Sequence, residues 1–332
     1  QRRDVFKLDR AGITEIAVEG AKLVKAEADR HPETEWTFEY SPESFTGTEL
    51  DFAVEICDAV NQVLRPTPEQ PVIINLPATV EMSTPNIYAD QIEWFCDHVA
   101  NRDAILISLH THNDRGCAVA AGELGVMAGA DRVEGTLMGN GERTGNMDIV
   151  TMAMNLYSQG IDPELKFDNM DAIIATVRDC TQLPVHPRHP YAGELVFTAF
   201  SGSHQDAINK CLALRGDEDA WDVAYLPIDP HDIGRTYQEV IRINSQSGKG
   251  GVAYVLYRDH GYDLPRWLQI DFSSAVQHLA EQSETEVASD QIHQLFCDTY
   301  LNVPGAWSLG RYEVAKDDTE HQLTAVLGTG DS

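Results

Sequence analysis

Two histidines separated by one residue, His110 and His112, are the side chains in this sequence best placed to bind a metal ion. They follow an apolar run at residues 104–109 that predicts a buried β-strand. Residues i and i+2 of a strand project to the same face, so both imidazoles can reach one ion. The alternative is a pair of polar residues at a strand end that bind only solvent.

Oxygen-bearing side chains accompany the histidines. Asn113 and Asp114 follow them directly, and a glycine-rich segment at residues 139–146 supplies Glu142 and Asn146. Mixed imidazole and oxygen donors suit Mg²⁺, Mn²⁺, Zn²⁺ or Fe²⁺. For Glu142, a solvated loop charge is an equally good interpretation.

Alternating helices and strands must position these residues. We expect helices at 10–31, 47–64, 86–100, 118–128 and 148–158, and strands at 36–40, 71–76, 104–109 and 132–137. Repeated βα units predict a parallel sheet covered by helices. Polar or glycine-rich loops follow all four strands, as in a (β/α)8 barrel, which carries its function at the carboxyl ends of its strands. Four strands make half of such a barrel.

The pattern changes beyond residue 157. We expect helices at 205–214, 234–243, 273–282 and 289–302, a Ser/Gly-rich loop at 244–251 and a strand-like segment at 310–327. These segments predict helical subdomains appended to the barrel.

The composition excludes several classes of partner. The 332 residues carry 53 acidic and 24 basic side chains, a net charge of −29, which repels nucleic acid and anionic membranes. Such a surface fits either a salt-rich cytoplasm or an ordinary acidic enzyme. The apolar runs fall short of the roughly 18 residues that span a bilayer, and the chain opens on no leader, so we expect a cytoplasmic protein. The six scattered cysteines, without a C-x-x-C pair, predict reduced thiols.

Several motifs occur in a definite order over roughly residues 1–310. The segment at 107–120, with its His-x-His-Asn-Asp core, is joined by motifs at 40–44, 75–81, 139–146, 198–206, 225–230 and 244–251. Together they resemble the 2-isopropylmalate synthase and homocitrate synthase group of the DRE-TIM metallolyase superfamily. Within it, the motifs resemble the 2-isopropylmalate synthases of the actinobacterial-type long form.

The resemblance implies a Claisen-type condensation. Acetyl-CoA would condense with 3-methyl-2-oxobutanoate, and hydrolysis of the thioester would give 2-isopropylmalate and CoA, the first committed step of leucine biosynthesis. Homocitrate or citramalate synthase of the same family is the nearest alternative, and an inactive remnant that only dimerises or binds is an alternative of another class. The resemblance also implies a homodimer, with leucine as feedback inhibitor of the full-length enzyme.

The resemblance also implies roles for individual residues. His110 and His112 would bind a divalent metal, Mg²⁺ first and Mn²⁺ or Zn²⁺ as alternatives, with Asn146 in or next to the metal's ligand shell. The metal would act as Lewis acid on the ketone. The residues with an implied substrate contact are Ser41, Thr79 and Glu142.

The condensation needs a base to take a methyl proton from the thioester. The resemblance assigns this role to His204, with Tyr225 and Glu43 beside it, and places His204 and Tyr225 in the active site of the partner subunit. On sequence alone, the Ser-x-x-Asp pattern at 203–206 equally predicts the start of a helix with His204 in its first turn.

Two further motifs resemble sites without matching them. His186 and His189 lie in a proline-rich segment that aligns them on no regular face, which favours a structural role. The segment at 247–251 lacks the G-x-x-x-x-G-K-[ST] frame of a phosphate loop. Lys249 remains a candidate contact for a CoA phosphate.

The resemblance predicts four domains. These are the C-terminal half of a (β/α)8 TIM barrel at 1–193, a linker subdomain I at 194–248, a helical subdomain II at 249–308 and the beginning of an α+β leucine-binding regulatory domain at 309–332. The family's Arg-Asp-Gly-type segment, whose Asp completes the metal site, is not found in this sequence. We therefore expect an internal fragment that is inactive and poorly stable by itself.

Overall fold

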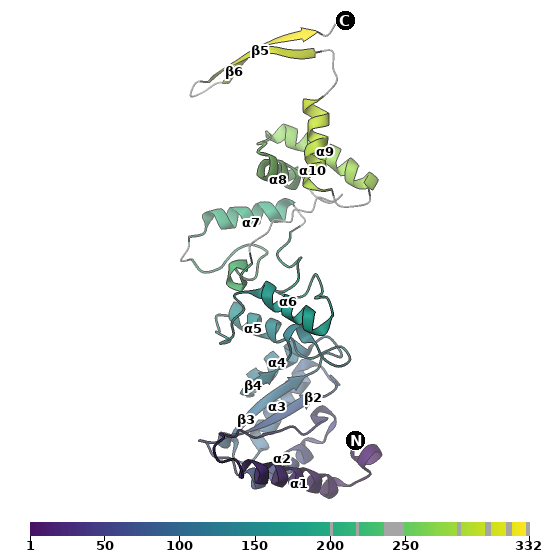
Figure 1. The fold of residues 1–332 in the computed structure, drawn as a ribbon, viewed down its shortest axis with the longest axis vertical. Helices are drawn as coiled ribbons and strands as arrows, with labels where there is room; N and C mark the ends of the chain where they lie inside the picture. Colours follow the sequence, from purple (N-terminus) through teal and green to yellow (C-terminus); the bar gives the residue numbers. More distant parts are fainter. Residues whose placement is uncertain are drawn as a thin grey trace. The chain divides into compact units, whose positions relative to one another are not determined.

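The computed structural model of the chain describes residues 1–199, 202–216, 219–235, 249–283, 287–302, 307–316 and 321–329 (Figure 1). The chain divides into two compact units. The first comprises residues 1–196 and 230–236, and the second comprises 197–229 and 237–332. The first unit contains the sheet with the histidine pair.

A four-stranded parallel sheet forms the centre of the first unit. Its strands, in the order β1-β2-β3-β4, are β1 Glu39–Tyr40, β2 Val72–Ala78, β3 Ile105–Thr111 and β4 Arg132–Glu134. The helices of this unit are α1 Arg10–Ala28, α2 Leu50–Leu64, α3 Pro85–His98, α4 Ala118–Met127, α5 Ile149–Ser158 and α6 Met170–Thr181. The sequential strand order, with a helix after each of the four strands, confirms the expected parallel α/β arrangement.

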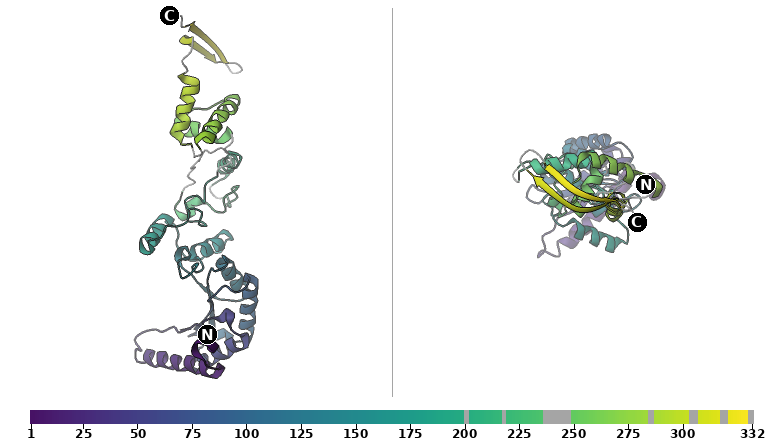
Figure 2. Two further views of the ribbon diagram at one scale, coloured as in Figure 1. Left: turned by 90° about the vertical axis from the view of Figure 1, so that its right-hand side faces the viewer. Right: turned by 90° about the horizontal axis from the view of Figure 1, so that it is seen from above.

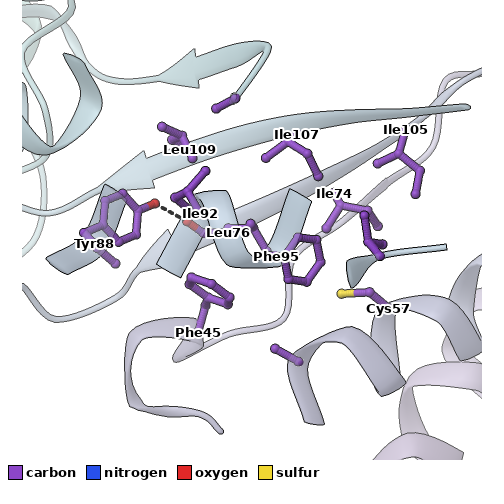
Figure 3. Close-up of a cluster of buried hydrophobic side chains, with 14 of the residues drawn as sticks. Phe45, Cys57, Ile74, Leu76, Tyr88, Ile92, Phe95, Ile105, Ile107 and Leu109 are labelled. Atoms are coloured by element: carbon purple, nitrogen blue, oxygen red, sulfur yellow. Dashed lines mark hydrogen bonds between the residues drawn. The ribbon is translucent and has the colours of Figure 1, made fainter. Parts of the chain in front are cut away.

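The core of the first unit lies between one face of the sheet and the helices. Ile74 and Leu76 of β2 and Ile107 and Leu109 of β3 are almost completely buried, and Figure 3 shows them on the side of α3, with Phe95 facing the sheet. Because side chains alternate between faces along a strand, the residues between them lie on the opposite face. That face carries Asn75, Ser108 and His110, which are polar.

The second unit is helical, with a terminal hairpin. Its helices are α7 Gly202–Leu214, α8 Lys249–His260, α9 Arg266–Ser283 and α10 Ser289–Phe296. Side chains from α8, α9 and α10, among them Leu256, Phe272 and Ile292, share one apolar cluster. Strands β5 Trp307–Lys316 and β6 His321–Thr329 pair antiparallel, side by side in both views of Figure 2.

Short helical turns complete the list of elements: Arg2–Phe6, Phe45–Gly47, Arg102–Ala104, Leu137–Gly139, Pro230–Ile233 and Cys297–Leu301. Among the residues that the structure describes, no helix is long and apolar enough to cross a membrane.

The structure corrects several expected elements. Strand β1 has two residues in place of 36–40, and β4 ends at Glu134, shortly before the turn Leu137–Gly139. Helix α6, begun by the Asn169 side chain accepting the Ala172 amide, was not expected. Helix α8 starts inside the expected loop at 244–251. Of that loop, residues 244–248 lie outside the described residues, as do 236–243 of the helix expected at 234–243.

Candidate active site

His110 and His112 lie at the carboxyl end of the central strand β3. His110 is the last but one residue of that strand and His112 follows its end. Their ring centroids are 5.2 Å apart, with the ring planes tilted by 46°. The expectation that the two side chains project together is therefore confirmed.

Both ring nitrogens of His110 have hydrogen-bond partners. Its Nδ1 lies 2.9 Å from Oε2 of Glu134, and its Nε2 lies 2.9 Å from Nδ2 of Asn146. Because a carboxylate only accepts, the proton belongs on Nδ1, and Nε2 accepts from the amide of Asn146. Backbone bridging between His112 and Asn146 brings the loop against the strand end. The structure thus gathers the three predicted metal ligands in one place.

His112 has an unsatisfied nitrogen in this cluster. Its Nδ1 is buried without a hydrogen-bond partner in the described structure. Burial first, and then the nearby Arg143 and His110 side chains, lower the pKa of His112. A neutral imidazole with an unused buried nitrogen has the chemistry of a metal ligand. The described residues contain no group of three or more His, Cys, Asp or Glu side chains arranged for a metal, so the cluster provides two imidazoles and one amide.

Glycines bring the 139–146 loop close enough for Asn146 to reach His110. A Cβ on Gly141 would lie 1.9 Å from Oδ1 of Asn146. Gly145 has φ +95°, and a Cβ there would lie 1.9 Å from the carbonyl oxygen of Gly139. Side chains at these positions are therefore incompatible with the loop as it stands.

Arg143 fastens the same loop to the ends of β2 and β3. Its guanidinium contacts both oxygens of Asp114, at 2.8 and 3.2 Å, and donates to the carbonyl of Thr79 at 2.6 Å. The hydrogen bond from Arg143, assisted by the Glu81 amide, lowers the pKa of Asp114 to about 2. The loop is thus tied to two strand ends by a charged pair that persists down to acidic pH.

The predicted substrate residues Ser41 and Thr79 lie at the ends of β1 and β2. Thr79 donates its hydroxyl to Oε2 of Glu43 at 2.7 Å and accepts the Ser44 amide at 2.9 Å. Ser41 accepts from the Asn75 amide at 3.2 Å, so its own hydroxyl hydrogen stays available. The structure therefore places the Thr79 and Glu43 side chains in contact. The Ser41 hydroxyl is linked by its hydrogen bond with Asn75 to the polar face of the sheet.

The Glu142 side chain forms no hydrogen bond with Ser41, Thr79 or Glu43 in the described structure. Its side chain is exposed, and its carbonyl accepts the amide of Gly145 within the loop. The structure leaves both of its interpretations, substrate contact and solvated charge, as predictions.

His204 and Tyr225 meet in the second unit. Their rings stack, with centroids 4.1 Å apart and an interplanar angle of 24°. Helix α7 begins at Gly202, so the expected helix start with His204 in its first turn is confirmed. Glu43 belongs to the first unit.

The other two histidines of the sequence analysis each have a separate partner. His186 Nδ1 accepts the Arg188 amide at 3.1 Å, and His189 Nε2 lies 3.5 Å from Asp148, which caps helix α5. These contacts support a structural role for both. Lys249 is the first residue of α8.

Sequence reasoning missed Glu134, the partner of His110. The available signal was an acidic residue in the strand expected next to the histidine strand. Register places Glu134 directly beside His110 in the sheet.

A parallel sheet with helices on its core face and polar side chains at its strand ends is typical of the α/β-barrel class. The HMGL-like family matches residues 1–177, and the chain belongs to this family, whose fold is a TIM barrel with a parallel sheet. A second match, described as alpha-isopropylmalate synthase, post-catalytic domain-like, covers residues 194–257.

Proteins named 2-isopropylmalate synthase resemble nearly the whole chain, which confirms the resemblance to that group, while the assignment to the actinobacterial-type long form stays a prediction. The one from Alcanivorax borkumensis is 59% identical over 327 residues, 98% of this chain and 58% of that protein. Those from Ralstonia pickettii and Rhodospirillum rubrum are each 58% identical over 99% of this chain and cover 58% and 60% of their own lengths. The chain thus spans about three-fifths of the curated relatives it matches.

Proposed function

We propose that this chain carries the active-site residues of a 2-isopropylmalate synthase, which condenses acetyl-CoA with 3-methyl-2-oxobutanoate and then hydrolyses the thioester with water to give 2-isopropylmalate and CoA. The observation that carries the proposal is the cluster of His110, His112 and Asn146 at the carboxyl end of β3, in a chain 59% identical to a protein of that name. The names of the relatives favour this reaction over homocitrate or citramalate synthesis and over a non-catalytic remnant.

In this proposal the cluster holds a divalent metal, with Mg²⁺ as the first candidate. The unsatisfied Nδ1 of His112 and the Nε2 of His110 that faces Asn146 support this assignment. A bound divalent ion supplies Lewis acidity, which polarises the ketone of the keto acid as the carbon–carbon bond forms.

The side chains at the ends of β1 and β2 would bind the keto acid. Ser41 has a hydroxyl hydrogen free to donate to the carboxylate, because its bond with Asn75 uses only a lone pair. Thr79 takes part by exchanging its bond to Glu43 for one to the keto acid. Glu142, exposed on the loop, is the third proposed substrate contact.

His204 is the proposed base that removes a proton from the methyl group of acetyl-CoA. A histidine can accept this proton near neutral pH. The stacked ring of Tyr225 restricts the orientation of the imidazole and adds a hydroxyl at the same place. Glu43 is the third proposed member of the catalytic group.

Finer parts of the proposal follow from the family. The sheet would belong to a (β/α)8 barrel, in a domain spanning 1–193, followed by subdomains at 194–248 and 249–308 and a leucine-binding regulatory domain starting at 309. The enzyme would be a cytoplasmic homodimer inhibited by leucine. The match of the post-catalytic domain over 194–257 supports a functional division near residue 194.

Keto-acid specificity tests the proposal. The intact protein is supplied with acetyl-CoA, Mg²⁺ and one of three keto acids, and CoA release is followed with a thiol reagent. We expect kcat/KM to be highest with 3-methyl-2-oxobutanoate. A preference for 2-oxoglutarate or pyruvate would indicate homocitrate or citramalate synthesis instead, and release with none of the three would contradict the proposal.

Gly141→Ala is expected to weaken metal binding by about 10–100-fold, the range typical of disturbed residues around metal ligands. The reason is the 1.9 Å approach of the added Cβ to the Asn146 amide, which must move away from His110. Calorimetric titration with Mn²⁺ measures the change. Gly20→Ala is the control, because a Cβ at Gly20 in α1 meets nothing within 4 Å. Equal affinities in the two variants would contradict a role for Asn146 at the metal.

A further inference from the structure

Glu134 accepts hydrogen bonds with both of its carboxylate oxygens. Oε2 lies 2.9 Å from Nδ1 of His110 and 3.2 Å from Nδ2 of Asn75. Oε1 accepts from Nη1 of Arg132 at 2.7 Å. The carboxylate therefore has three donors from three neighbouring strands, and its side chain is only 22% exposed.

The donors to Glu134 are themselves fixed. Arg132 also contacts Ser108 of β3 at 2.9 Å and Glu39 of β1 at 3.1 Å. The amide of Asn75 spans from Glu134 to Ser41. This network restricts the carboxylate to one orientation, in which a single oxygen points at His110.

We infer that Glu134 is a positioning residue, which keeps the proton of His110 on Nδ1 and leaves Nε2 as the ligand atom toward the loop. The inference rests on the proposed metal site and adds a residue to it. Without the carboxylate at Nδ1, the Asn146 amide at Nε2 is the remaining hydrogen-bond partner of the ring, and by turning its oxygen toward Nε2 it can also accommodate a proton there. A carboxylate behind a ligating imidazole fixes the tautomer and raises the basicity of the donor atom.

A purely structural role would make Glu134 only the ion-pair partner of Arg132. Glu39 provides the matched control for this alternative, because it contacts the same Arg132 nitrogen and not His110. Glu39→Gln and Glu134→Gln each remove one carboxylate from Arg132. Only Glu134→Gln also changes the acceptor for His110, since one amide oxygen cannot serve three donors.

The experiment measures the tautomer of His110 in the metal-free intact protein by ¹⁵N NMR of labelled histidines, and then Mn²⁺ affinity by calorimetry. His110→Gln identifies the His110 signals. We expect Nδ1 to carry the proton in the wild type and in Glu39→Gln. In Glu134→Gln we expect a mixture of tautomers and an affinity lower by about 10–100-fold.

Three outcomes would overturn the inference: an unchanged tautomer in Glu134→Gln, an unchanged affinity in that variant, or equal losses in Glu39→Gln. Glu134→Asp is measured as a second variant. We expect the same change in tautomer and the same fall in Mn²⁺ affinity, because the shorter side chain cannot keep both carboxylate oxygens in contact with their donors. This variant provides the test if Glu134→Gln does not fold. Failure of the wild type to bind Mn²⁺ would contradict the proposed metal site, whereas the tautomer measurement still tests Glu134.

Discussion

Replacing His112 by alanine is expected to abolish detectable metal binding and to lower kcat for CoA release by about 10³-fold or more, because Lewis-acid assistance contributes several kcal/mol to such a reaction. His112 contributes a buried ring nitrogen without a hydrogen-bond partner beside His110. Among the described residues, no other side chain of the cluster has such a nitrogen. Calorimetric titration with Mn²⁺ and an assay of CoA release measure the two effects.

His98→Ala is the matched control for His112→Ala. His98 is an exposed histidine at the last turn of α3, where its ring stacks on Trp94. Its removal should leave metal affinity and kcat unchanged. If His112→Ala bound Mn²⁺ as tightly as His98→Ala, the histidine pair would not be a metal site.

The second large effect is expected for His204→Gln, in which kcat should fall by about 10²–10⁴-fold, the contribution typical of a general base. Glutamine fills a similar space and forms hydrogen bonds, but it cannot take a proton from the thioester's methyl group. Mn²⁺ affinity should stay unchanged, because His204 is not one of the proposed metal ligands and its ring packs on Tyr225.

Tyr225→Phe separates the roles of the two stacked rings. Phenylalanine retains the ring that lies 4.1 Å from the His204 ring and removes only the hydroxyl. We therefore expect a smaller loss of kcat than in His204→Gln.

A kcat for His204→Gln within about threefold of the wild type, which is a barrier change of less than 1 kcal/mol, would exclude His204 as the base.

Local patterns were sufficient to predict the position of the histidine pair. A strand's side-chain alternation is a property of neighbouring residues, so the joint projection of His110 and His112 follows from their spacing. The same holds for the expected helices of the first unit, whose apolar faces repeat along the sequence. Helix α6 was missed, and its β-branched residues at 173, 174, 176 and 177 lower its intrinsic helix propensity.

Contacts between strands were beyond what local patterns predict. Glu134 meets His110 because β3 and β4 pair in one particular register, and register depends on the packing of the whole sheet. The reach of Asn146 likewise depends on how the glycine loop closes against β3. Nothing in the spacing of residues 134 and 146 from the histidines specifies either contact.

The most direct test of the account is the metal dependence of the condensation in the intact protein. Protein stripped with a chelator and then freed of it is given acetyl-CoA and 3-methyl-2-oxobutanoate, and 2-isopropylmalate is quantified by mass spectrometry before and after Mg²⁺ or Mn²⁺ is added. We expect no product from the metal-free protein and restored product formation on adding the ion, in the wild type but not in His112→Ala. Undiminished formation of 2-isopropylmalate by metal-free protein would contradict the assignment of the strand-end cluster.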